Sequence, residues 1–308
     1  KCGKLLMSMY GTRDAALNWA IEYGETVRAD GYKQGTSNPC RFHNDRLGVS
    51  VMVHGDDFIA EGVSESLDAL EDLLRTWIEI KILGRVGPGV SGAQQGKILK
   101  RNIEWRQFPS PRFVWYADCR HVSNFLRTIG LPEDSKPMQS PGTKATGGTV
   151  DITKAISTEE QKMVPKAGGI LIYLAQDVPQ IQYAAKAVMQ DASKPTGATV
   201  ARLKRAGRYL IGHRITEWHY VEQELPGEVS TEGDSDWAGS EDARSSQCCV
   251  LMFGSHCLEV LTSNQTVVAT ASAIAELLAL NKAAATSILA RNILEEMGVS
   301  VFAVAGTD

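Results

Sequence analysis

The chain lacks the features that mark several common classes of protein. Six cysteines occur among its 308 residues, but none forms a Cys-x-x-Cys pair or accompanies a histidine series, which favours free thiols in a reducing compartment over zinc or disulfides. No apolar run approaches the roughly 20 residues of a membrane-spanning helix. An initiator methionine and a signal peptide are also absent, so Lys1 is interpreted as lying within a longer polypeptide.

A surplus of positive charge, common in nucleic-acid binders, is missing too. The chain has 32 Lys and Arg against 36 Asp and Glu, a net charge of −4. Basic residues nevertheless gather between residues 192 and 216, where no acid occurs: Lys194, Arg202, Lys204, Arg205, Arg208 and Arg214. This stretch predicts contacts with nucleic-acid phosphates through counterion release, and composition alone equally allows a solvated helix face.

The stretch from Val49 to Ile59 predicts a β-hairpin with acidic residues at its tip. Apolar residues alternate on both sides of a Gly-Asp-Asp sequence. Gly55 supplies the positive φ of a type II′ turn, which places Asp56 second in the turn and Asp57 at the start of the return strand. Two crowded carboxylates repel each other unless a cation, a proton or solvent intervenes, and Mg²⁺ prefers carboxylate oxygens. The hairpin is therefore a candidate metal site, although Asp and Gly are also ordinary residues of exposed turns.

Apolar periodicity predicts helices on both sides of this hairpin. The first helix is marked by four apolar residues at helical spacing that are expected to face the core: Leu17, Ala20, Ile21 and Val27. The second begins at a Ser64 cap, runs to about Ile80 and has a four-residue apolar face: Leu67, Leu70, Leu74 and Trp77. Residues 84–96 are rich in glycine but lack the Gly-Lys-Ser/Thr ending of a phosphate-binding loop. Residues 131–154 carry Pro and paired Gly without periodicity, which predicts a linker.

Several segments resemble the second half of the reverse transcriptase and ribonuclease H region of copia-type LTR retrotransposon polyproteins. Residues 9–20, MYGTRDAALNWA, are similar to the family signature Leu-Tyr-Gly-Leu-Lys-Gln-Ala-Pro-Arg-Ala-Trp. The sequence His54-Gly55-Asp56-Asp57 stands where the family has Tyr-Val-Asp-Asp on its metal-binding strand. Residues 166–190 resemble the family's Gly-x-Leu-x-Tyr-Leu and Pro-Asp-Ile-x-Tyr-Ala elements, with Tyr183 at the second tyrosine.

The last quarter carries a further resemblance. Residues 233–280 are similar to the family pattern Ser-Asp-Ala-Asp-Trp-Ala-Gly, Arg-Ser-Thr, Gln-x-x-Val-Ala and Ser-Ser-x-Glu-Ala-Glu. Thirteen residues match this family pattern: Asp234, Asp236, Trp237, Ala238, Gly239, Arg244, Ser245, Ser246, Gln265, Val268, Ala269, Ala275 and Glu276. By motif position, the resemblance implies ribonuclease H acids at Asp234, Glu276 and Asp308. Acids on two strand ends and a helix can converge on two cations about 4 Å apart. Taken singly, Glu276 is also an ordinary acid of a helix start and Asp234 an ordinary turn residue.

The resemblance implies a fold of class α+β and α/β in three parts. A partial polymerase palm and thumb is expected in residues 1–130, a helical connection in 131–225, and a ribonuclease H-like mixed sheet with helices in 226–308. The implied chemistry is two-metal phosphoryl transfer with Mg²⁺ or Mn²⁺, and the expected catalytic and metal-binding residues are Asp56, Asp57, Asp234, Glu276 and Asp308. The implied partners are an RNA template, an RNA–DNA hybrid and, in the full-length protein, dNTP, with no membrane partner. The implied location is a cytoplasmic virus-like particle or the nucleus.

Departures from the family pattern define the alternatives. Asp14 replaces a Gln, His54 replaces a Tyr, and Ile274 stands where the family has an additional acid. A decayed or repurposed remnant that binds nucleic acid without catalysis is therefore the second hypothesis, and a protein-interaction module on the same scaffold is the third. Because the family's other palm Asp is expected before Lys1 and a fourth ribonuclease H acid after Asp308, the 308 residues alone are predicted to lack polymerase activity and to show weak or no nuclease activity.

Overall fold

The computed structural model describes residues 8–9, 11–90, 94–142, 155–239 and 243–307. The chain divides into two compact units, one made of residues 1–83 and 288–303 and the other of residues 84–287 and 304–308. Helix α7 (Ser272–Glu296) and strand β12 (Phe302–Gly306) each pass from one unit into the other. The predicted boundaries at 130 and 225 differ from this division.

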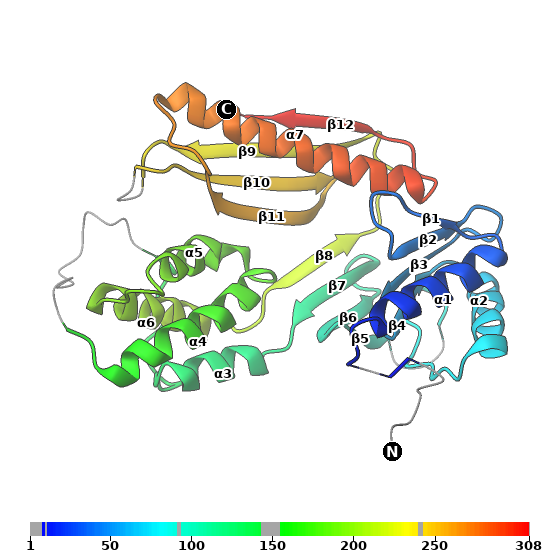
Figure 1. Ribbon diagram of the computed structural model, residues 1–308, viewed down its shortest axis with the longest axis horizontal. Helices are drawn as coiled ribbons and strands as arrows, with labels where there is room; N and C mark the ends of the chain where they lie inside the picture. The colour runs from blue at the N-terminus through cyan, green and yellow to red at the C-terminus, as the bar shows by residue number, and fades with distance from the viewer. Residues whose placement is uncertain (1–7, 10, 91–93, 143–154, 240–242, 308) are drawn as a thin grey trace, which may run out of the picture. The chain divides into compact units, whose positions relative to one another are not determined.

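The first unit is a four-stranded antiparallel sheet with two helices on one face (Figure 1). The strands lie in sequence order: β1 (Lys33–Gln34), β2 (Arg41–Asn44), β3 (Val49–His54) and β4 (Asp57–Glu61). Helix α1 (Ala15–Ala29) and helix α2 (Ser64–Trp77) cover the sheet. The shared core consists of Tyr23, Val27, Tyr32, Phe42, Val49, Val51, Val53, Leu70 and Leu74. Alternate residues of β3, Val49, Val51 and Val53, belong to this core, and Ser50 is buried on the opposite face of the sheet.

Both predicted helices form, with corrections. Val63 occupies the N-cap of α2, so Ser64 is the first helical residue and not the cap, and the helix ends at Trp77 rather than near Ile80. On α1, Leu17 is 63% and Ile21 is 48% exposed, so the expectation that they face the core is wrong. They lie about 80° and 120° around the helix from buried Val27, at 100° per residue.

The carboxylate of Glu296, at the end of α7, binds the loop between β1 and β2 within the first unit. Its Oε1 accepts hydrogen bonds from the Thr36 N–H at 2.9 Å, the Thr36 hydroxyl at 2.7 Å and the Ser37 N–H at 2.8 Å. A side chain on Gly35 would not fit, since a Cβ there would lie 2.8 Å from the Asn38 backbone carbonyl oxygen as well as 2.6 Å from Glu296 Oε2. Burial acts to raise the pKa of Glu296, but the hydrogen bonds from Ser37 and Thr36 outweigh it and lower the pKa.

Replacing Glu296 by Gln should therefore make stability less dependent on pH. A carboxylate whose pKa is lowered in the folded state adds stability above its unfolded pKa of about 4.3, and this stability is lost as the pH falls through the folded value. We expect E296Q to be less stable than the unmodified chain by about 1 kcal/mol at pH 7 and the difference to shrink below about pH 4. Urea unfolding across this pH range measures it, with E295Q at the adjacent exposed glutamate as the matched control. A difference that stays constant with pH would contradict the assignment.

The second unit begins with another antiparallel sheet. Its strands, in spatial order, are β5 (Gln95–Ile98), β6 (Arg101–Arg106), β7 (Arg112–Ala117) and β8 (Glu217–Val221). Strand β8 comes from the segment predicted to be a connection, yet it pairs with β7 over Arg112–Tyr116. The two predicted segments therefore share one sheet.

A bundle of helices follows this sheet in the second unit. Its members are α3 (Arg120–Thr128), α4 (Thr158–Ala175), the short 3₁₀ helix η1 (Pro179–Ile181), α5 (Gln182–Gln190) and α6 (Gly197–Gly212). Phe125 and Leu126 of α3 are fully buried in the same cluster as Leu171 of α4 and Leu203 of α6. Helix α3 thus packs with the helices beyond the predicted boundary at 130. Of the predicted linker, residues 131–142 form no helix or strand and 143–154 lie outside the described residues.

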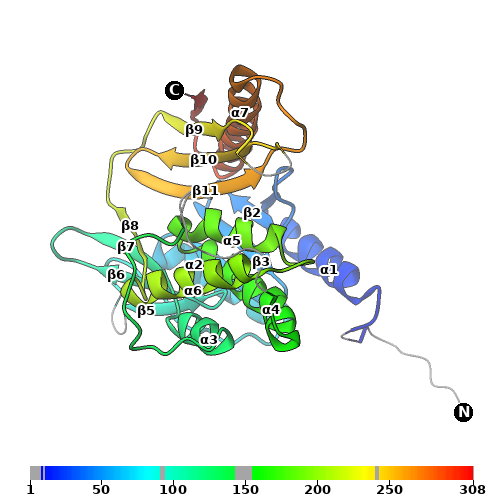
Figure 2. The same cartoon turned by 90° about the vertical axis from the view of Figure 1, so that its left-hand side faces the viewer.

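The last sheet has the order β11-β10-β9-β12 and helices on both faces. Strands β9 (Glu228–Asp236), β10 (Ser246–Phe253) and β11 (His256–Asn264) are antiparallel neighbours, and β12 runs in the direction of β9 (Figure 1). Helix α7 packs on one face through four small residues spaced four apart, Ala275, Ala279, Ala283 and Ser287. Opposite them, a Cβ on Gly233 would lie 3.0 Å from the Ala279 carbonyl, so the glycine permits a close helix–sheet approach. Helix α5 lies beside β11 (Figures 1 and 2), where Gln182 Nε2 donates to the Val260 carbonyl at 2.6 Å.

The sequence was expected to contain no segment able to span a membrane, and helix α7 does not agree with this expectation. Its length and composition alone are sufficient to cross a bilayer, and in the described residues it is the one helix of which this is true. Core helices of soluble proteins also reach this length and hydropathy, and α7 packs on the sheet through its alanine face.

Candidate functional site

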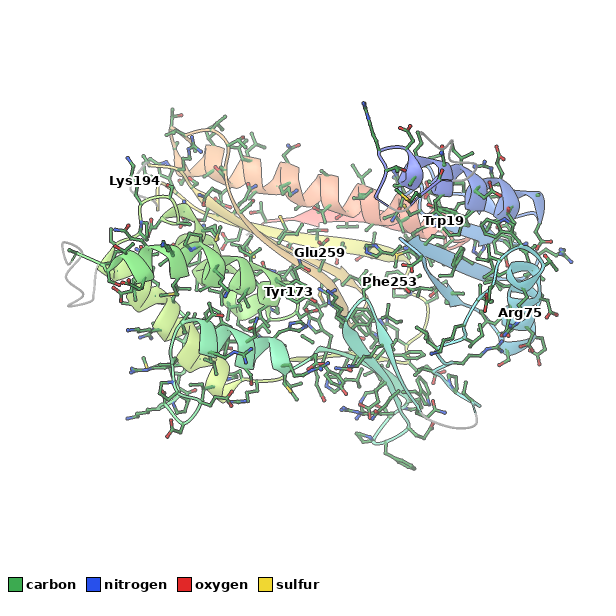
Figure 3. All side chains as sticks on the ribbon, turned by 60° about the horizontal axis from the view of Figure 1, so that its bottom comes forward. Trp19, Arg75, Tyr173, Lys194, Phe253 and Glu259 are labelled. Atoms are coloured by element: carbon green, nitrogen blue, oxygen red, sulfur yellow. The ribbon has the colours of Figure 1, made fainter. Side chains whose placement is uncertain are left out.

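The predicted hairpin is confirmed, with its acids facing solvent. His54 pairs with Asp57, so Gly55 and Asp56 form a two-residue turn, and Gly55 has φ +64°. Asp56 and Asp57 are both exposed. The tip is held to α1 because Trp19 Nε1 donates a 2.7 Å hydrogen bond to the Gly55 carbonyl (Trp19 is labelled in Figure 3). The two carboxylates thus project from a turn whose backbone is anchored.

Glu276, on the second turn of α7, contacts the ends of two strands. Its Oε1 accepts a hydrogen bond from the Ser235 hydroxyl at 3.0 Å, and its Oε2 accepts one from the Thr307 hydroxyl at 3.2 Å. Ser235 follows Asp234 in β9, and Thr307 precedes Asp308, which lies outside the described residues. Glu276 therefore sits between the immediate chain neighbours of the two other predicted acids.

Other residues of the matched motif place Glu276 there. Buried Gln265 donates from Nε2 to the Ala275 carbonyl at 2.7 Å and from its backbone N–H to the Ser245 carbonyl at 2.8 Å. Trp237 Nε1 donates to the Ala269 carbonyl at 3.0 Å. These bonds hold the segment that leads into α7 against the end of β9. Part of the motif is therefore scaffold that positions a carboxylate.

The side chain of Asp234 does not share the α7 face of the sheet. Along β9, Thr231 and Gly233 are buried against α7 and Ser235 contacts Glu276, so the residues between them point to the opposite face. Asp234 is exposed there, and its Oδ1 accepts the 2.7 Å hydrogen bond of the Ser235 N–H. The structure thus brings Ser235 and Thr307 to Glu276, but not the Asp234 carboxylate. Neither hydroxyl was predicted from the sequence. The sequence feature that could have indicated them is that Ser235 and Thr307 each adjoin a predicted acid.

The oxygen donors at Glu276 suit Mg²⁺ in kind, since Mg²⁺ and Mn²⁺ prefer carboxylate and hydroxyl oxygens to nitrogen or sulfur. In the part of the chain that the structure describes, no three His, Cys, Asp or Glu side chains gather closely enough to hold one metal ion. The predicted third acid, Asp308, is not among these residues.

The predicted basic residues divide into partnered and exposed ones. Arg202 forms an ion pair with Asp191, Arg214 forms one with Glu133 at 2.7 Å, and Arg205 Nε donates to the Gly142 carbonyl at 3.2 Å. The three others are exposed: Lys194, labelled in Figure 3, and Lys204 and Arg208 on α6. Since Lys204 and Arg208 are four residues apart, they lie on one side of α6. Three of the six predicted cations are thus exposed, and the other three have polar partners within the chain.

No family model matches the chain. The chain is similar to an uncharacterized mitochondrial protein of Arabidopsis thaliana, with 30% identity over 144 residues, which are 47% of this chain and 57% of that protein. The chain therefore spans just over half the length of the curated relative it matches.

Proposed function

We propose that this chain derives from the reverse transcriptase and ribonuclease H region of a retrotransposon polyprotein, and that its last sheet hydrolyses the RNA strand of an RNA–DNA hybrid. The position of Glu276 between the ends of β9 and β12 is the observation that carries the proposal. A retrotransposon-related origin is further supported by the similarity to the Arabidopsis mitochondrial protein.

In the proposed reaction, Glu276 acts as a metal-binding carboxylate. The Ser235 and Thr307 hydroxyls each donate to one of its oxygens and so fix the orientation of the carboxylate plane. Bound Mg²⁺ would supply an activated water and would stabilise charge on the leaving oxygen of the phosphodiester. Asp234 and Asp308 are proposed as the further ligands from their motif positions alone, since the Asp234 carboxylate projects from the opposite face of the sheet in this structure.

Asp56 and Asp57 are proposed as the metal ligands of the polymerase half. Their exposure on a turn anchored by Trp19 leaves both carboxylates accessible to an incoming nucleotide. The proposed partners of this half are an RNA template and dNTP. We expect no Mg²⁺-dependent primer extension by the 308 residues alone, and measurable extension would contradict this expectation.

Cleavage of a labelled RNA–DNA hybrid in Mg²⁺ or Mn²⁺ tests the proposal. The assay compares the 308-residue chain with a polypeptide extended by its own flanking coding sequence. Cleavage by the extended protein that is abolished in D234N supports the enzyme. Salt-sensitive hybrid binding without cleavage in either protein favours a non-catalytic nucleic-acid-binding remnant.

The remnant is the second candidate because of one structural observation. Asp234 and Glu276 lie on opposite faces of the sheet, so the two acids do not meet in this arrangement. Ile274, where the family pattern has another acid, is 42% exposed and adds no ligand.

A further inference from the structure

Helix α5 places a lysine and a tyrosine on the face of the last sheet that carries Asp234 and Asp236. Lys186 Nζ donates a hydrogen bond to the Ser246 hydroxyl of β10. Ser246 is paired directly with Asp236, so these two side chains share a face, and Asp234 joins them two residues along β9. The lysine thus lies next to the acidic end of β9, on the face opposite α7.

In the described residues, Lys186 has few polar contacts. Its polar contacts there are the Ser246 hydroxyl and the face of Tyr183, whose ring centroid lies 4.5 Å from Nζ, and it has no ion-pair partner. The pKa of Lys186 is lowered from its ordinary value, because the effect of burial is larger than the opposite effect of the negative charge of Asp236. An ammonium group has three N–H donors, so the bond to Ser246 leaves donors for an anion.

Tyr183 does not serve the core on which its helix packs. Helix α5 is anchored by buried Ala184, Ala185 and Val188, whereas the Tyr183 side chain is 49% exposed. Lys186 Nζ lies over one face of the ring, and about half of the side chain remains open to a ligand. Such a ring is a platform for a sugar or a base, while the neighbouring cation suits a phosphate.

We propose that Lys186 and Tyr183 form a subsite for the sugar–phosphate backbone of a nucleic-acid strand lying along the Asp234 face of the sheet. The inference rests on the nucleic-acid binding within the proposed function and not on cleavage at Glu276, which lies on the opposite face of the sheet, and it adds residues outside the basic stretch of α6. Because Asp234 and Asp236 repel phosphates, a fixed cation beside them sets where a phosphate is able to approach. Lys186 pairs with that phosphate, and the Tyr183 ring packs on the adjoining sugar or base.

Salt-dependent binding of a fluorescent RNA–DNA hybrid tests the lysine. Anisotropy titrations in EDTA, between about 50 and 200 mM KCl, give the slope of log K against log salt. We expect K186M to reduce the steepness of this slope by about 0.9, the loss of one phosphate contact, and K186R to retain it. K166M, at an exposed lysine on α4, is the matched control. It should have the same slope and the same affinity as the unmodified chain.

The tyrosine is tested by binding of the same hybrid. Y183A should weaken binding about fivefold or more, since stacking on an aromatic ring is lost, and Y183F should retain affinity. Thermal unfolding curves establish that each variant is folded. If the unmodified chain binds the hybrid and K186M keeps its slope, or Y183A its affinity, the subsite is wrong while the proposed function stands. If the unmodified chain does not bind the hybrid at any salt concentration, both are wrong.

Discussion

In the polypeptide extended by its flanking coding sequence, replacing Glu276 by Gln should lower the rate of Mg²⁺-dependent hybrid cleavage at least about 100-fold, while leaving the unfolding free energy nearly unchanged. The amide keeps the size of the side chain and one oxygen, so at least one of the hydrogen bonds from Ser235 and Thr307 is retained. It removes the negative charge that would hold the metal. Loss of a charged ligand should cost more than the 10–100-fold typical of groups that only orient one.

Two further variants make this prediction specific. S235A keeps the carboxylate and removes one of its orienting hydroxyls, so we expect a smaller loss of about tenfold. E259Q makes the same chemical change at an exposed glutamate of β11 in the same sheet and should cleave at the unmodified rate (Glu259 is labelled in Figure 3). Cleavage by E276Q at the rate of E259Q would exclude Glu276 from the reaction, and equal losses in E276Q and S235A would show that only orientation matters.

Local sequence determined the hairpin at Gly55 because every requirement for it lies within a few residues. Alternating valines define the strand, and a glycine able to adopt positive φ defines the turn. The inner face of α2 was likewise predictable, since Leu70 and Leu74 are buried at the expected spacing. On α1, four apolar residues do not distinguish a core face from an exposed flank, because Leu17 and Ile21 lie beside that face.

The candidate site at Glu276 was only partly predictable because its geometry depends on contacts distant in sequence. A motif indicates that Asp234 ends a strand but not which face of the sheet its side chain occupies. Gly233 has no side chain, so α7 is able to pack closely on the face of β9 to which Gly233 belongs. Because successive residues of a strand point to opposite faces, Asp234 then points away from α7. The packing of α3 with the later helices and the pairing of β8 with β7 are likewise tertiary outcomes without a local signal.

Replacing Trp19 by Ala should lower the stability of the first unit by about 3 kcal/mol. Its ring stacks on Trp77 with centroids 5.4 Å apart and an interplanar angle of 9°, and it meets Tyr23 and Phe58 edge to face. Trp19 thus joins both helices to the sheet. Urea unfolding followed by circular dichroism measures the loss, because this signal does not depend on the tryptophan that is removed.

A subtler variant separates packing from the bond to the hairpin tip. W19F keeps most of the aromatic contact but cannot donate to the Gly55 carbonyl, so it should cost only about 1 kcal/mol and yet speed hydrogen exchange in the turn that carries Asp56. W77F is the matched control, since it weakens the same stack and leaves the Trp19–Gly55 bond intact. If both variants change exchange over residues 49–61 equally, the bond does not anchor the turn. If only W19F speeds exchange in this segment, the indole N–H of Trp19 on α1 fixes the backbone of the turn. The two predicted polymerase carboxylates project from this turn, so their spacing is then set by the core as well as by the hairpin.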